Sequence, residues 1–197
     1  MQLNIRQFSC KIAAGIFASV LIFGGTPLVS TAAAERPLAP EKTPPGDIPD
    51  SQAFVTYTSA LGFSLQVPEG WARTDRANGV GFADKYNALD VAVGAAGGAP
   101  TVESVTRYEA AELIKVGRAV KIESINSVRL AVGPAILMVY SSNSAPNPVT
   151  NKQLRLENQR YFIYRAGTVA SLNVSAPLGA DNIDQWNRIA RSFKWLK

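Results

Sequence analysis

The segment 62–71, GFSLQVPEGW, alternates apolar and polar residues and then breaks at a proline. Successive side chains of an extended chain point to opposite faces, so the three large apolar residues of this run share one face. These residues are Phe63, Leu65 and Val67. The pattern is typical of a β-strand with one face on a core. Residues 68–70, PEG, end the strand in a turn before Trp71.

Further alternating or apolar runs predict a sheet. Strands are expected at residues 54–58, 80–82, 89–93, 122–132, 135–140, 154–164 and 169–175. A helix is expected from its N-cap Thr101 to about Arg118, and a second helix follows Asp181, which together with Asp184 resembles a capping box. Short turns join most strands, which favours antiparallel pairing. The sequence therefore predicts an α+β domain, a mostly antiparallel sheet flanked by helices.

The first 34 residues resemble an export signal. Arg6 and Lys11 precede an apolar run at 12–23, and Ala32 and Ala34 fit the small-x-small rule for cleavage. Spanning a bilayer takes about 20 apolar residues, so this run favours cleavage after Ala34 over an uncleaved membrane anchor. We expect the protein to be exported to a periplasm, a thylakoid lumen or the outside of the cell.

Residues 35–53 are rich in proline, which favours extended backbone and removes a hydrogen-bond donor. Such a composition rarely packs a core, so the segment is interpreted as a disordered or semi-rigid linker. The alternative is a docking segment for a partner. The folded domain is expected to occupy residues 54–197.

The residues available for chemistry are restricted. The chain has no histidine, and its one cysteine, Cys10, lies in the predicted signal. Ser-His-Asp and Cys-His sites are therefore excluded, and zinc, haem and copper sites lose their common ligands. Loss of Arg6 and Lys11 lowers the net charge from +5 to +3, which is too mild for a nucleic-acid interface. We expect no cofactor, no metal and no nucleic-acid partner.

Two polar regions are candidates for binding a partner. Arg73, Arg76 and Lys85 lie around the turn after Trp71, where they form either a partner-binding edge or a solvated surface. The loop 141–152 is long for a hairpin connection, and long loops often carry function. Its candidate residues are Asn143, Asn147 and Lys152. The alternative for this loop is a mobile polar connection.

Glu109 is placed near the middle of the apolar face of the predicted helix, between Val102 and Leu113. A buried carboxylate needs a partner or a raised pKa. One hypothesis is that Glu109 lines a ligand cavity between helix and sheet. The alternatives are a structural ion pair, or a helix rotated slightly from this register.

The order and spacing of several motifs resemble the PsbP-like family over residues 54–197. The residues that carry the resemblance are Tyr57, the run at 62–71, Gly133-Pro134-Ala135 leading to Tyr140, Ser175-Ala176-Pro177, Trp186, Ile189 and Ser192-Phe193. These motifs are strand ends, turns and a closing helix, so they locate a scaffold rather than a site. The resemblance implies a PsbP-like α/β/α sandwich.

The resemblance also implies an exported, non-catalytic accessory protein that binds or assists an envelope or thylakoid-lumen protein complex. In a photosynthetic host, that complex would be photosystem II. We expect a monomer that contacts a membrane only peripherally or through an uncleaved signal. Two alternatives remain open: a carrier of a small or lipid-like ligand held between sheet and helix, and a hydrolase that uses carboxylates or a Ser–Lys pair.

Overall fold

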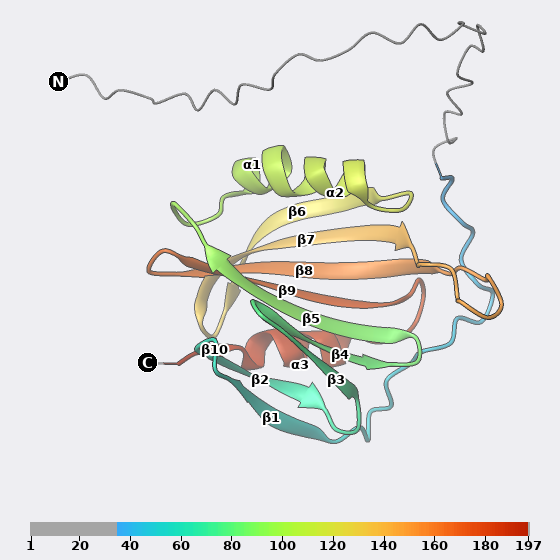
Figure 1. Ribbon diagram of the computed structural model, residues 1–197, viewed down its shortest axis with the longest axis horizontal. Helices are drawn as coiled ribbons and strands as arrows, with labels where there is room; N and C mark the ends of the chain where they lie inside the picture. The colour runs from blue at the N-terminus through green and yellow to red at the C-terminus, as the bar shows by residue number, and fades with distance from the viewer. Residues whose placement is uncertain (1–34, 197) are drawn as a thin grey trace, which may run out of the picture. The chain divides into compact units, whose positions relative to one another are not determined.

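Two antiparallel sheets form the framework of the chain (Figure 1). A computed structural model describes residues 35–196. The strands are β1 (Phe54–Ser59), β2 (Phe63–Pro68), β3 (Ala72–Arg76), β4 (Gly79–Asp84), β5 (Asn87–Ala95), β6 (Lys121–Leu130), β7 (Gly133–Asn143), β8 (Arg155–Arg165), β9 (Thr168–Pro177) and β10 (Lys194–Trp195). The helical segments are α1 (Val102–Ser104), η1 (Val105–Ala110), α2 (Ala111–Val116) and α3 (Ile183–Ser192).

Within the described residues, the large sheet has the order β3-β4-β5-β9-β8-β7-β6 and the small sheet the order β1-β2-β10. Every strand expected from the sequence is present, and the predicted α+β class with antiparallel pairing is confirmed. The hairpin of β8 and β9 turns at Ala166 and Gly167, whose φ angles are both positive. A two-residue turn with both φ angles positive has a backbone twist that matches the right-handed twist of the two strands it joins.

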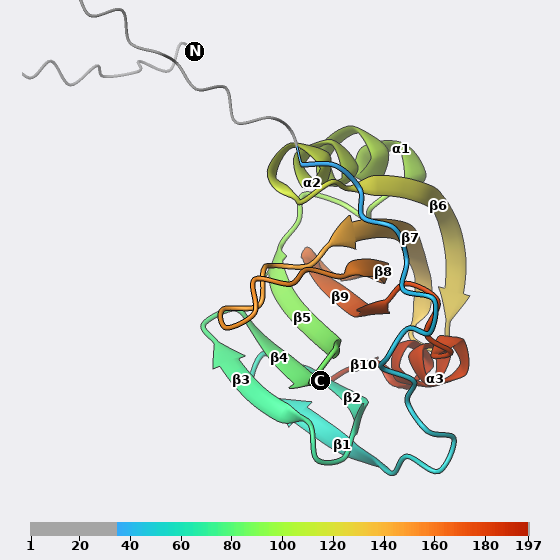
Figure 2. The same cartoon turned by 90° about the vertical axis from the view of Figure 1, so that its right-hand side faces the viewer.

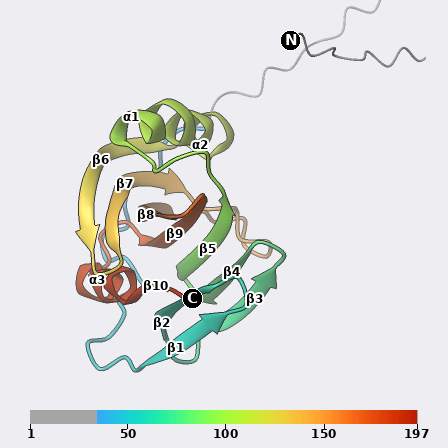
Figure 3. The ribbon, with the colours of Figure 1, turned by 90° about the vertical axis from the view of Figure 1, so that its left-hand side faces the viewer.

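Helices cover both faces of the large sheet (Figures 2 and 3). The segments α1, η1 and α2 run on without a break over one face, where Val105 and Ala110 pack against Ile136, Met138 and Phe162. The other face packs against α3 and the small sheet, around Trp186 and Leu172 among others. The helix–sheet–helix layering expected from the sequence is therefore present.

An aromatic row joins the small sheet to α3. The ring of Phe63 in β2 stacks on Phe193, with centroids 5.6 Å apart, and Phe193 meets Trp195 of β10 edge-on at 5.3 Å. Tyr57 of β1 lies 5.1 Å from Phe82 of the large sheet. The alternating run at 62–71 thus provides the contact between the two sheets and the last helix.

One strand of the large sheet does not follow from the sequence pattern. β3, with the sequence ARTDR, is exposed at all five positions and has no apolar alternation. It forms an edge of the sheet and pairs only with β4. Backbone hydrogen bonds, which leave no mark on side-chain pattern, account for its place in the sheet.

The start of α3 differs from the expectation. Asn182, not Asp181, is the N-cap, and its side chain makes no capping hydrogen bond. The predicted capping box of Asp181 and Asp184 is therefore wrong. The Asn182 side chain is completely buried and is used elsewhere, in contacts with residues 46 and 48.

Residues 35–50 lie along the domain from the end of α2 to α3 (Figure 2), and we refer to them as the strap. The strap contains no helix or strand. Its Ile48 is 4% exposed and belongs to the main core. Gly46 has a φ of 103° and passes so close to Pro177 that a Cβ there would lie 3.1 Å from the proline ring. The segment predicted to be a disordered or semi-rigid linker is therefore packed against the domain.

The predicted export signal, residues 1–34, lies outside the described residues. Among residues 35–196, no helix is both long and apolar enough to cross a membrane.

Candidate functional site

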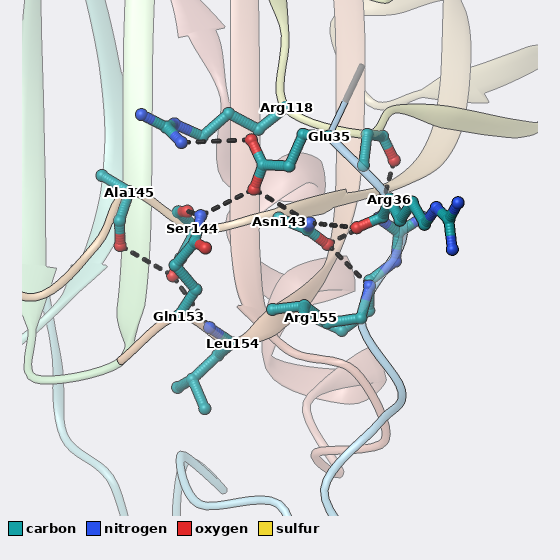
Figure 4. Close-up of polar contacts among 11 residues, drawn as sticks. Glu35, Arg36, Arg118, Asn143, Ser144, Ala145, Gln153, Leu154 and Arg155 are labelled. Carbon is teal, nitrogen blue, oxygen red and sulfur yellow. Dashed lines mark hydrogen bonds and ion pairs between the residues drawn. The ribbon is translucent and has the colours of Figure 1, made fainter. Parts of the chain in front are cut away.

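The first residue of the strap is held by three side chains from the domain (Figure 4). The carboxylate of Glu35 accepts hydrogen bonds from Asn143 at 3.0 Å and Gln153 at 2.7 Å, and pairs with Arg118 at 3.1 Å. The hydrogen bonds from Asn143 and Gln153 hold the pKa of Glu35 below its ordinary value, and the charge of Arg118 acts in the same direction. Sequence reasoning singled out only Asn143 among these residues, because the members of the site are far apart along the chain.

Asn143 links the strap to a buried arginine. Its side-chain oxygen accepts from the backbone N–H of Leu38 at 3.1 Å and from Arg155 at 3.0 Å, and its amide group donates to the Arg36 carbonyl at 2.8 Å. Arg155 is 5% exposed and also donates to Ser141 and to the Ala119 carbonyl, each at 2.7 Å. Burial lowers the pKa of Arg155. Asn143 is thus a buried structural residue, because the strap and Arg155 use its hydrogen-bonding groups.

The other loop candidates also make contacts within the chain. Lys152 pairs with Glu41 of the strap at 2.8 Å. Asn147 accepts from the backbone N–H groups of Val149 and Thr150, so it shapes the loop itself. The structure brings Asn143 and Lys152 together along the strap. The alternative interpretation of residues 35–53, as a docking segment for a partner, stays a prediction.

A second anchor holds the far end of the strap. The side-chain oxygen of Asn182 accepts from the Ile48 N–H at 2.7 Å, and its amide group donates to the Gly46 carbonyl at 2.9 Å and to Asn87 at 3.2 Å. A buried backbone group without a partner is costly, and Asn182 provides one for the buried Ile48 N–H and one for the half-buried Gly46 carbonyl.

Acid is expected to loosen the first strap contact. A lowered folded-state pKa means that Glu35 stabilises this contact fully above its unfolded pKa of about 4.3. The contribution disappears as the pH falls through the lower folded-state value. We expect the protection of the Leu38 amide against hydrogen exchange to fall in that window.

The matched control for the acid effect is Glu35→Gln, which has no carboxyl group to titrate. In this variant, the protection of the Leu38 amide against hydrogen exchange is expected to be lower than in the unchanged protein above that pH window. It is also expected to change less as the pH falls. Identical pH profiles for the two proteins would show that Glu35 does not control the contact.

The candidates around β3 do not form one cluster. Arg73 pairs with Asp75 at 2.7 Å and lies over the ring of Tyr57, and Arg76 pairs with Asp90. The ion pair of Arg76 with Asp90 passes over Gly81 of β4. A Cβ at Gly81 would lie 2.8 Å from the Asp90 carboxylate, so only glycine leaves room for the pair there. Both arginine charges are therefore compensated locally.

Lys85 lies apart from these pairs, in the turn between β4 and β5, with a φ of 47°. The role of the three residues in binding a partner stays a prediction.

Glu109 is exposed, so its predicted place on the buried face of the helix is wrong. The cause is the π-helical turn in η1. A π-helix bonds residues five apart, which brings Val105 and Ala110 onto the sheet and turns Glu109 outward. Val102 and Val116, assigned to the same face by α-helical spacing, are 38% and 67% exposed.

A small pocket lies at the start of this helix, but Glu109 does not line it. The pocket has a volume of about 210 Å³ and is bordered by Pro100, Val102, Ile136, Phe162 and Tyr164, among others. Ligand pockets usually measure about 300–1,000 Å³. The pocket at the start of the helix is therefore smaller than a usual ligand site and is not the cavity hypothesised beneath Glu109.

A larger groove, of about 570 Å³, lies between β2 and α3. Thr56 of β1 and Ser64 and Gln66 of β2 line one side. The charged residues of the lining are Asp184, Arg188, Arg191 and Lys194. Sequence reasoning missed this groove because it combines residues 56–66 with residues 184–194.

No metal-binding group of three or more acidic, histidine or cysteine side chains occurs within residues 35–196.

Comparison with known proteins identifies the fold. No protein-family model and no curated protein matches the chain in sequence. Its structure is similar to the solution structure of CyanoP, the cyanobacterial PsbP of Synechocystis sp. PCC 6803, with a TM-score of 0.52 at 13% identity. The match covers 76% of this chain and 98% of CyanoP. The fold is PsbP-like.

Two further similarities are weaker. The Ran-binding protein Mog1p of Saccharomyces cerevisiae has a TM-score of 0.49 at 9% identity, covering 73% of this chain and 95% of Mog1p. LpqN of Mycobacterium tuberculosis, described as involved in cell envelope biogenesis, has a TM-score of 0.47 at 17% identity, covering 74% of this chain and 91% of LpqN. The PsbP-like fold confirms the scaffold expected from the resemblance in sequence, and it does not assign a site.

Proposed function

We propose that the protein is an exported, non-catalytic accessory protein that binds a protein complex of the cell envelope or the thylakoid lumen. The observation that carries this proposal is the groove between β2 and α3. It is open to the surface, larger than the pocket beside the other helix, and lined by charged side chains of both signs. Such a surface suits a macromolecular partner better than an enclosed small ligand.

The PsbP-like fold supports this role over a carrier or a hydrolase. The fold is shared with CyanoP over nearly the whole length of CyanoP. In a photosynthetic host, this similarity favours the thylakoid lumen as the location of the protein. The carrier hypothesis required a cavity at Glu109, and that side chain is exposed. The hydrolase hypothesis gains no support from the contacts around the strap, since these hydrogen bonds join the strap to the domain.

The proposal is tested by capturing the native protein from its own cells. Cells are crosslinked lightly, and the protein is captured with an antibody against residues 102–116. This helical segment packs on the face of the large sheet opposite α3, whereas a tag at the carboxyl terminus would lie beside Lys194 of the groove. A partner of the envelope or lumen should co-purify in a fixed ratio.

The capture is compared with one from cells that lack the protein. Absence of any enriched partner, together with a small molecule retained in native mass spectrometry, would overturn the accessory role and favour the carrier.

A further inference from the structure

We propose that the groove between β2 and α3 binds an acidic, extended segment of the partner protein. This inference rests on the proposed function and names the chemistry of its partner. It depends on three cations that face one groove, on the lack of ion pairs to them among residues 35–196, and on a polar side wall.

Arg188 is held in position at the groove. Its Nε donates to Gln66 at 2.8 Å, and its guanidinium lies 4.2 Å from the centre of the Phe54 ring. A guanidinium has five N–H donors, and the contact with Gln66 uses one of them. The remaining donors are therefore available, in a fixed place, to a carboxylate.

Arg191 and Lys194 extend the positive charge along the groove. Arg191 lies three residues after Arg188, on the same side of α3, and Lys194 follows where β10 pairs with β2. Within residues 35–196, no carboxylate forms an ion pair with any of the three, although seven other basic residues are paired. The charge of this groove is thus left for an external anion.

The one carboxylate in the lining of the groove does not neutralise the positive charge of the three cations. Asp184 lies in the first turn of α3, where a negative charge stabilises the helix end. Three cations and one carboxylate leave a net charge of +2 on the lining. Complementary charge gives specificity and speeds association, so an acidic segment is the partner that this groove favours.

The polar wall favours a peptide over a lipid surface. Thr56 and Asn187 line the groove, and no side-chain hydrogen bond within residues 35–196 occupies them. An extended peptide can enter the groove and bond to these groups with its backbone. A flat membrane would meet only the protruding cations.

The test uses the protein recovered after expression of the full chain and a fluorescein-labelled peptide of alternating glutamate and serine. Binding is followed by fluorescence anisotropy. The double variant R191E/K194E is expected to weaken binding about tenfold or more, because two attractive contacts become repulsive. The affinity of the unchanged protein should also fall with salt, since the Debye length shrinks from about 30 Å at 0.01 M to about 10 Å at 0.1 M.

The matched control is R107E/K115E. It changes the net charge equally but lies on the helical segment over the opposite face of the sheet. Its affinity for the peptide is expected to stay within about twofold of the unchanged protein. Equal unfolding midpoints for both variants establish that R191E/K194E is folded.

Three results would overturn the inference. The first is a peptide affinity reduced equally by both double variants. The second is that the unchanged protein does not bind the peptide. The third is binding to phosphatidylglycerol vesicles through Arg191 and Lys194 without binding of the peptide, which would identify a membrane site.

The cellular capture separates this inference from the function on which it rests. If R191E/K194E captures the same partner in the same amount as the unchanged protein, the groove assignment fails and the accessory role stands. If the unchanged protein captures no partner, the accessory role itself fails.

Discussion

Replacement of Phe63 by alanine is expected to lower the free energy of unfolding by about 3–5 kcal/mol. Phe63 is fully buried and stacks on Phe193, with an angle of 14° between the rings. Its removal leaves a cavity where the small sheet, the large sheet and α3 meet. Chemical denaturation followed by tryptophan fluorescence measures the change.

Val149→Ala is the control for this truncation, because Val149 is 89% exposed in the loop before β8. It should change the free energy of unfolding by less than about 0.5 kcal/mol. A loss below about 1 kcal/mol in Phe63→Ala would contradict the assignment of Phe63 to the centre of the core.

Replacement of Asn182 by alanine is expected to cost about 2–4 kcal/mol of stability. It removes the acceptor of the buried Ile48 N–H and the donor to the Gly46 carbonyl, and each buried group left without a partner costs about 1–3 kcal/mol. Denaturation measures the total loss. Hydrogen exchange at the Ile48 amide reports whether the strap is released.

The matched control is Asn126→Ala, at an exposed position of the edge strand β6. It should leave both measurements nearly unchanged. Retained protection of the Ile48 amide in Asn182→Ala would show that the core contact of Ile48 alone holds the strap.

Local pattern was sufficient to predict most of the fold. The alternation of Phe63, Leu65 and Val67 gave β2, and the cap at Thr101 gave the start of the first helix, where its hydroxyl accepts from the Ser104 N–H. These features depend on neighbours within a few residues. Hairpins and caps are therefore visible to sequence reasoning.

The strap could not be predicted in the same way. Its prolines indicate extended backbone, and this is correct, but composition does not show whether an extended segment packs against a domain. One buried side chain, Ile48, and two distant asparagines, Asn143 and Asn182, decide the question. Of the three, only Asn143 was singled out from the sequence, and then as a residue for binding a partner.

The helix over the large sheet shows a different limit. Spacing by 3.6 residues assigned Val116 to the buried face, but the π turn in η1, which precedes it, shifts the face by one residue. No residue type marks that turn. Glu109 was assigned to the wrong face for this reason alone.

The groove was missed because its two walls come from opposite ends of the domain. Residues on β1 and β2 meet residues on α3 and β10, and the pairing of Lys194 with Ser64 brings the two ends together. A single sequence gives no direct indication that two segments so far apart along the chain are in contact.

The position of the strap has a consequence for the order in which the chain folds. Ribosomes make residues 35–50 early, but the hydrogen bonds from Leu38 and Ile48 reach partners 105 and 134 residues later. Asn182 is synthesised when only the last helix and its tail remain to be made. The strap therefore cannot complete its contacts until nearly the whole domain has been synthesised, although its residues are the first of the described domain to be made.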